Sequence, residues 1–411
     1  MITRTEAKAK IKAIISMHKP IKTGLTLPVR KGDTFDVFRI PIDLLVPNIL
    51  NDRITWRIRE YEAANGRQLS IENAADVEYL YTLILEEHPA ENERTLADLA
   101  RNGQQVDGVI TNTGIIIDGN RRATLLRSLF KGEAEKFKQS VEDFRYFNAI
   151  VLPDDMDDIE IMAMETMLQI GADKKIDYNR ICLYIKVDNL RKAGCTYSQV
   201  KQYMNLKSEK DVEEMENIFA LMQEYLMAID KPNHFTLLDK LEDQFINTKT
   251  VFKRLDNRTY HAEWDYTESD IANFKMVCYD YMRAKFEGKK YRDKLVGKPN
   301  KTDGVFIEKT VWDAFLQHHE EIIDKNNPTT EQDWELLGKK GGKFERNLND
   351  AEQKLITVLN DKNLSKLIRE VQIKVDRISE LTDEMEEVAD EDLCSLKQLS
   401  KSIYKITKKY E

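Results

Sequence analysis

The sequence predicts an α+β N-terminal domain with a small mixed sheet, followed by all-α regions. Two observations favour this division. Segments with the apolar pattern of a strand all lie before residue 153, and the patterns after it are helical. The length of 411 residues is enough for two or three domains. We expect an N-terminal helix and loop, an α+β domain, a helix-turn-helix-like domain and a helical C-terminal region, at 1–35, 36–155, 156–232 and 233–411.

The N-terminal half alternates helices with short strands. Helical patterns are expected at 4–18, 55–64, 72–87, 93–102 and from Asn120 to about Phe130, and residues 24–32 are expected to form a loop. Strands are expected at 36–42, 108–111, 115–117 and 146–152. The turn Asn112-Thr113-Gly114 joins the second and third of these as a hairpin.

Helices dominate the chain after residue 154. They are predicted at 157–169, 177–193, 197–204 and 209–229, with Thr196 as N-cap and Gln199 at the capping-box position. Two helices joined by a short turn and followed by a third have the spacing of a helix-turn-helix. Further helices are expected from Thr267 to about Phe286 and at 305–324, with a basic linker at 288–301 between them.

Two features near the C-terminus leave alternatives open. The loop Lys339–Lys343 has the residues of a phosphate loop but no preceding strand and no Walker spacing, so a flexible loop is favoured. Apolar residues at heptad spacing, with Lys374 interrupting one core position, predict either a dimeric coiled coil or an intramolecular helical hairpin. These residues are Leu364, Leu367, Val371, Ile378, Leu381, Met385 and Val388.

Composition and charge limit the functional classes. A hydrophobic content of 41% with 33% charged residues is typical of a folded protein with much helical surface. The net charge of −9 argues against coating nucleic acid by charge alone. No apolar run has the length of a membrane span, the first residues lack the apolar region of a signal peptide, and the four cysteines form no Cys-x-x-Cys motif. We therefore expect a cytoplasmic protein without a membrane partner.

The stretch Thr113–Leu126 organises the first domain. Three isoleucines form a buried strand, Gly119 permits a sharp turn, and Asp118 or Asn120 can cap the helix that follows. Arg121 and Arg122 then fall in the first helical turn, where the helix dipole disfavours cations. Their presence beside free N–H groups suggests that an anion, most simply a phosphate, lies between them. The alternative is a solvated helix start.

This order of elements resembles the ParB-type chromosome and plasmid segregation proteins of the ParB/sulfiredoxin fold superfamily, over roughly residues 36–230. The segment Ile40–Asn48 with Arg53 is similar to the opening strand of the family, its Pro-Asn turn and the following arginine. Asp118–Arg122 falls where the family has its Gly-Glu-Arg-Arg box. Met164-Glu165-Thr166 falls where a Glu-Asn motif leads into a helix-turn-helix.

The resemblance implies a nucleotide site for CTP or ATP with Mg²⁺. Arg121 and Arg122 would hold phosphate oxygens, Gly119 would allow close approach, and Asp118 and Glu165 would be the catalytic and metal-binding carboxylates. The other implied nucleotide-binding residues are Arg53, Asn120 and the loop residues Gly103, Gln104 and Gln105. In the family, nucleotide binding switches a dimer between open and clamped states on DNA, so DNA and a second copy are the implied partners.

Departures from the family pattern weaken the expectation of hydrolysis. Asn120 stands where the family has a glutamate, Asp107 lies near the place of a missing proline, and Thr166 and Gln169 replace an asparagine and an arginine. Sulfiredoxin chemistry is not expected, because the box of that family needs a cysteine before the arginine and this chain has Asn120 there. The third helix of the helix-turn-helix, after Ser208, is acidic, which opposes its insertion into a DNA groove.

Three functions remain open from the sequence. The first is a nucleotide-gated clamp or switch associated with DNA, with or without NTPase activity. The second is a nuclease of a mobile-element or phage-defence system, in which Asp107, Asp118 and Glu165 gather around Mg²⁺. The third is a non-enzymatic adaptor with a vestigial site, in which the helical tail mediates assembly with a protein partner.

Overall fold

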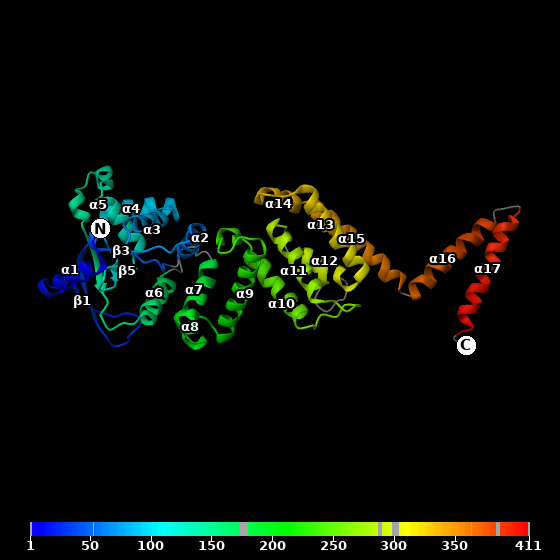
Figure 1. Ribbon diagram of the computed structural model, residues 1–411, viewed down its shortest axis with the longest axis horizontal. Helices are drawn as coiled ribbons and strands as arrows, with labels where there is room; N and C mark the ends of the chain where they lie inside the picture. Colours follow the sequence, from blue (N-terminus) through cyan, green and yellow to red (C-terminus); the bar gives the residue numbers. More distant parts are fainter. Residues whose placement is uncertain are drawn as a thin grey trace. The chain divides into compact units, whose positions relative to one another are not determined.

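The chain is described from a computed structural model (Figure 1) over residues 2–51, 53–172, 180–286, 290–297, 304–362, 364–383 and 387–409. It divides into two compact units, Met1–Asn257 and Arg258–Glu411. The first unit holds a sheet and ten helices of the described chain, and the second is helical.

A mixed sheet of six strands forms the centre of the first unit, in the order β1-β2-β6-β4-β5-β3. β3 pairs with β5 and β4 with β6 in parallel, whereas the other three pairings are antiparallel. The β4–β5 pairing confirms the predicted hairpin. The strands are β1 (Lys22–Leu25), β2 (Phe35–Pro41), β3 (Val46–Pro47), β4 (Gly108–Ile110), β5 (Ile115–Asp118) and β6 (Tyr146–Val151).

Helices cover both faces of this sheet. On one face, α1 (Arg4–Met17), α4 (Pro89–Asn102) and α5 (Asn120–Phe130) share an apolar core with residues such as Ile40, Ile116 and Phe147. On the other face, α6 (Asp158–Ala172) and the segment after β1 cover Val109, Ile117 and Ile150. The inner strands β4 and β5 are therefore covered on both faces, which explains their mostly apolar sequences.

Two helices, α2 (Thr55–Asn65) and α3 (Ala74–Glu86), lie between β3 and α4 in the chain and pack through Ile54, Ile58, Leu80 and Leu83. Four more complete the unit: α7 (Arg180–Lys192), α8 (Tyr197–Tyr203), α9 (Glu209–Ala228) and α10 (Glu242–Asp256). The predicted capping box at Thr196 and Gln199 is present at the start of α8.

The second unit is built around buried aromatic side chains, among them Tyr281, Phe306, Trp312 and Phe344. The stretch expected to be a basic linker contains a helix, α12, over its described residues. The helices are α11 (Glu268–Arg283), α12 (Lys290–Val296), α13 (Lys309–Asn326), α14 (Glu331–Gly338), α15 (Lys343–Asp361), α16 (Leu364–Asp383) and α17 (Asp390–Thr407). Within the described ranges, no helix combines the length and apolarity needed to cross a membrane.

The sequence did not predict β1, which begins in the stretch expected to lead into a loop. Its first three residues are exposed, so the strand has no buried face and leaves no apolar alternation. The heptad residue Met385 lies outside the described residues.

Candidate functional site

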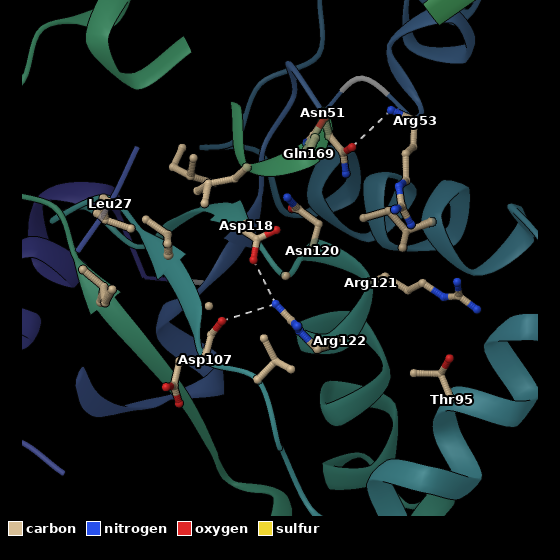
Figure 2. A pocket seen from close by; sticks show the side chains of 18 of the residues that line it. Leu27, Asn51, Arg53, Thr95, Asp107, Asp118, Asn120, Arg121, Arg122 and Gln169 are labelled. Carbon is tan, nitrogen blue, oxygen red and sulfur yellow. Dashed lines mark hydrogen bonds and ion pairs between the residues drawn. The ribbon is translucent and has the colours of Figure 1, made fainter. Parts of the chain in front are cut away.

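The topology of the sheet brings three chain segments to one edge. Because β4 is antiparallel to β5, Asp107 and Gly108 at the start of β4 lie beside Asp118 at the end of β5. Because β3 is parallel to β5, the segment after β3 reaches the same edge, and the Asn48 N–H donates to Oδ1 of Asn120. A cavity of about 570 Å³ opens at this edge (Figure 2).

The cavity has a charged side and an apolar side. Its charged side includes Arg53, Glu87, His88, Asp107, Asp118, Arg121 and Arg122. Its apolar side is formed by side chains from β1 and the following segment, from the sheet and from α6, namely Leu25, Leu27, Val109, Ile117, Ile150 and Leu168. A cavity of this size that combines an apolar wall with polar groups able to orient a ligand is typical of small-molecule sites.

The start of α5 depends on glycine. Gly119 is the N-cap residue with φ of 91°, and a Cβ there would lie 2.9 Å from Cζ of Phe147. The expectation that Asp118 or Asn120 caps this helix is wrong, because no side chain bonds to its first N–H groups in the described structure. The side chain of Asp118 instead accepts from Arg122.

Asn120 holds the neighbouring segments together. Its Oδ1 accepts from the Asn48 N–H at 3.1 Å, and its Nδ2 donates to the Ile116 carbonyl at 2.9 Å. The side chain is 6% exposed. Where the resembled family has a glutamate, this chain therefore has a structural amide whose oxygen and nitrogen are both engaged with backbone groups.

Replacing Asn120 with aspartate is expected to lower the free energy of unfolding by about 1–3 kcal/mol, because a carboxylate cannot donate to the Ile116 carbonyl. Urea unfolding of the full chain measures this. Asn102→Ala, which removes a bond to the exposed Asp98 side chain, serves as the control and should change stability by less than about 0.5 kcal/mol. An equally small effect of Asn120→Asp would contradict the structural role.

The two adjacent arginines point in opposite directions (Figure 2). Arg122 turns toward Asp118, which it meets at 2.9 Å, and toward the Asp107 carbonyl at 3.3 Å. Arg121 turns the other way, to the side where Thr95 of α4 lies. The geometry therefore gives no support to one phosphate between the two guanidiniums, and that role of the arginine pair stays a prediction. At the start of α5, the ion pair of Arg122 with Asp118 therefore lies on one side and Arg121 lies on the other.

A wall that the sequence did not reveal comes from the junction of α3 and α4. Glu87 and His88 line the cavity there, and His88 adopts a left-handed conformation with φ of 55°. Burial raises the pKa of the Glu87 carboxyl, and the positive charges of His88, Arg57 and Arg53 oppose this rise. The local signal was Pro89 at the first position of α4, which marks a helix start but not a site.

The predicted loop residues lie elsewhere. Gly103 and Gln104 line a separate cavity of about 380 Å³ that also includes Arg39 and Tyr146. The side chain of Gln104 donates to the Asn148 carbonyl at 2.8 Å and accepts from the Asn148 N–H at 2.8 Å, so it fastens the loop to β6. Gln105 is exposed and donates to the Asn102 carbonyl. The nucleotide-binding role of these three residues stays a prediction.

Glu165 is buried beneath the cavity rather than among its lining residues. It is 1% exposed and meets Nζ of Lys186 on α7 at 3.5 Å. Gln169, which lines the cavity, donates its Nε2 to Glu165 at 3.1 Å. Glu165 is thus placed to connect the cavity with α7, and its predicted catalytic role stays a prediction.

The carboxylates do not form a metal cage. Among the described residues, no group of three or more histidine, cysteine, aspartate or glutamate side chains could hold a metal ion. Asp118 is paired with Arg122, and Glu165 with Lys186. The metal-binding role of Asp118 and Glu165 stays a prediction, and the described arrangement gives no support to the metal-dependent nuclease predicted as an alternative.

The acidic helix α9 is tied to its neighbours. Glu216 accepts from Arg191 of α7 at 2.8 Å and from Tyr197 of α8 at 2.7 Å, and Glu214 accepts from Lys249 of α10 at 2.6 Å. Its acidic side chains therefore stabilise the helical module. The interpretation of this module as a DNA-binding helix-turn-helix stays a prediction.

Comparisons with known proteins add little beyond this geometry. No family model matches the chain, and no curated protein matches it. A search of solved structures finds the C-terminally truncated chromosome-partitioning protein ParB from Caulobacter crescentus, complexed with CTP-γ-S. The identity is 15%, the match covers 51% of this chain and 98% of that chain, and the TM-score is 0.19. The similarity is therefore distant.

Proposed function

We propose that the cavity at the start of α5 binds a nucleoside triphosphate, CTP or ATP, and that its occupancy is transmitted to α7–α9. One observation carries the proposal: a cavity of about 570 Å³ joins the N-terminus of an 11-residue helix and three arginines to an apolar wall. A helix N-terminus with arginines suits a phosphate chain, and an apolar wall suits a base.

The phosphate end lies at the first turn of α5. The first intrahelical bond runs from the Ala123 N–H to the Gly119 carbonyl at 2.8 Å, and the N–H groups of a first helical turn, which have no acceptor within the helix, are typical anion-binding groups. Arg121 and Arg53 add guanidiniums from α5 and from the segment before α2 (Figure 2). Guanidinium groups are planar donors suited to phosphate oxygens.

The base end lies against the sheet. Leu27, Ile117 and Leu168 come from three different elements and line the same cavity. A base stacked on this wall would remove apolar surface from water, which is favourable for any of the common bases. The amide of Gln169 lies at this wall and offers a polar contact, but the residues do not determine which base is preferred.

Two polar connections lead from the cavity to α7. The first runs from Gln169 through Glu165 to Lys186. The second runs through α2, which begins just after Arg53 and whose Arg59 contacts Asp188 at 3.3 Å. A ligand that moves Arg53 or Gln169 would therefore act on α7 from two points, which is the basis for proposing a switch.

Isothermal titration calorimetry tests the binding proposal. The full chain is titrated with CTP, ATP, inorganic triphosphate and the two nucleosides, in Mg²⁺ and in EDTA. We expect at least one nucleotide to bind, with the triphosphate contributing more than the nucleoside. Binding should persist in EDTA, because the part of the chain that the structure describes holds no group of three or more possible metal ligands. Absence of binding by both nucleotides would overturn the proposal.

Glu87→Gln is expected to raise the affinity for inorganic triphosphate several-fold near neutral pH, because it removes a negative charge from the cavity. Since the pKa of Glu87 is raised, the wild type should approach the variant as the pH falls through that pKa. Affinities are compared between pH 5 and 8. Arg53 and Arg57 are common to both proteins, so the ratio of the two affinities reports Glu87 together with its contact to His88 at 3.8 Å. If the affinities of Glu87→Gln and the wild type are equal at every pH, Glu87 does not lie beside the bound triphosphate.

We propose binding rather than turnover, because Asn120 is engaged with backbone groups and the described residues contain no group of three or more possible metal ligands. DNA remains a proposed partner of the switch. A salt-dependent titration with duplex DNA, with and without nucleotide, tests that partner separately.

A further inference from the structure

A cavity in the second unit lies between α13 and α15. Its volume is about 350 Å³, which falls within the range of small-molecule sites. Lys325 lines it from the last turn of α13, and Lys343, Arg346 and Asn347 line it from the first turns of α15. The loop Lys339–Lys343, which has the residues of a phosphate loop, therefore ends at this cavity.

This cavity is positively charged, although the chain as a whole has a net charge of −9. Lys325, Lys343 and Arg346 line it, and Asp350 is the one carboxylate residue among its described lining residues. Lys325 is paired with Glu321 at 3.0 Å. Neither Lys343 nor Arg346 makes an ion pair with another described residue, so two positive charges at this cavity have no counter-charge at ion-pair distance.

Polar and apolar groups that could hold the rest of a ligand lie beside these cations. Asn347 is 3% exposed, and its Nδ2 donates to the Phe315 carbonyl of α13 at 3.2 Å. No described donor bonds its Oδ1, so this oxygen can accept from a ligand hydroxyl. Ile322 of α13 adds an apolar surface to the lining. Lys343 is held near the end of α13, because its Nζ donates to Oδ1 of Asn326 at 2.6 Å.

We propose that this cavity binds a small phosphorylated sugar, independently of the cavity at the start of α5. The Arg346 guanidinium is a planar donor for phosphate oxygens, and the Lys343 ammonium adds a positive charge beside it. Asn347 accepts from a sugar hydroxyl, and Ile322 contacts the carbon skeleton. Inorganic phosphate uses only the two cations, so the phosphorylated sugar binds more tightly than phosphate.

Calorimetry on the full chain carrying Arg121→Ala tests binding at this site, because that substitution weakens the cavity at the start of α5. The titrants are ribose 5-phosphate, inorganic phosphate and ribose at constant ionic strength. We expect ribose 5-phosphate to bind most tightly and ribose not to bind. These titrations do not depend on whether the first cavity binds a nucleotide. No binding of ribose 5-phosphate at millimolar concentration would overturn the proposal.

Charge substitutions locate the phosphate. Adding Arg346→Ala should weaken ribose 5-phosphate binding about tenfold or more, because it removes a charged hydrogen-bond donor. The matched control is Arg369→Ala, which removes an exposed arginine of α16 and should change the affinity less than about twofold. Asp350→Asn should strengthen binding several-fold, because it removes the carboxylate from the lining. Equal losses in Arg346→Ala and Arg369→Ala, or weaker binding by Asp350→Asn, would contradict this placement.

Protection from acetylation gives a readout at the site itself. Ribose 5-phosphate should slow the acetylation of Lys343 several-fold and leave that of the exposed Lys374 on α16 unchanged, as measured by mass spectrometry of the full chain. Equal rates at Lys343 with and without the ligand would place the ligand elsewhere and overturn the proposal. Circular dichroism checks that each variant keeps its helix content.

Discussion

Arg121→Ala is expected to weaken nucleoside triphosphate binding about a hundredfold, the largest effect of any single change in the cavity. Hydrogen bonds to charged groups contribute about 1.5–3 kcal/mol each, and a loss of about 2.7 kcal/mol corresponds to a factor of a hundred. Calorimetric titration of the full chain with CTP and ATP measures the change. Arg121→Lys should fall between wild type and alanine, since a lysine keeps the charge but not the planar donor geometry.

Arg94→Ala provides the matched control for this prediction. Arg94 is an exposed residue of α4 outside the cavity lining, so its removal changes the net charge equally without touching the proposed site. We expect its nucleotide affinity to stay within about twofold of wild type, because distant exposed charges are screened by salt. Equal losses in Arg94→Ala and Arg121→Ala would mean that Arg121 acts only through net charge.

Glu165→Ala is expected to lower the free energy of unfolding by about 3–5 kcal/mol, the largest predicted effect on stability. The carboxylate and the Lys186 ammonium lie 3.5 Å apart with side-chain exposures of 1% and 3%. Removing the carboxylate takes a close counter-charge away from a buried ammonium, which is strongly destabilising. Chemical unfolding of the full chain, followed by far-ultraviolet circular dichroism, measures the loss.

The paired substitution separates a buried ion pair from simple packing. Glu165→Leu with Lys186→Met removes both charges and should recover most of the lost stability. Asp313→Ala, which breaks an exposed pair with Lys309, should cost no more than about 1 kcal/mol. A double variant as unstable as Glu165→Ala would show that shape rather than charge dominates at this position.

Glu165 belongs both to the buried ion pair and to the proposed connection from the cavity to α7. Glu165→Gln keeps a hydrogen-bonding side chain beside Gln169 while removing the charge that meets Lys186. We expect this variant to bind nucleotide but to lose any nucleotide-dependent change in hydrogen exchange over α7–α9. Retention of that change would show that the signal does not pass through this pair.

Local sequence patterns predicted most of the first unit. Three neighbouring patterns predicted a strand, a turn and a helix in succession: the isoleucines of β5, the glycine at 119 and the apolar face of α5. The structure confirms all three. The capping box at Thr196 also marked the start of α8 correctly, because a capping box depends only on two residues three positions apart in the sequence. Short edge strands such as β1 carry no comparable signal.

The cavity was predictable only in part. The Asp118–Arg122 turn follows a recognisable strand, and Arg53 was implied by the family resemblance; both line the cavity. Glu87 and His88 reach it through the packing of α3 and α4, which no local pattern encodes. The orientation of α6 was also hidden, because apolar residues such as Ile159, Met162 and Met164 surround the helix and leave its inward side undefined.

A crystal structure with CTP or ATP bound tests the central claim most directly. We predict phosphate oxygens within hydrogen-bonding distance of the first N–H groups of α5 and of the Arg121 guanidinium, with the base against Leu27 and Leu168. A nucleotide bound elsewhere, with this cavity empty at millimolar ligand, would contradict it.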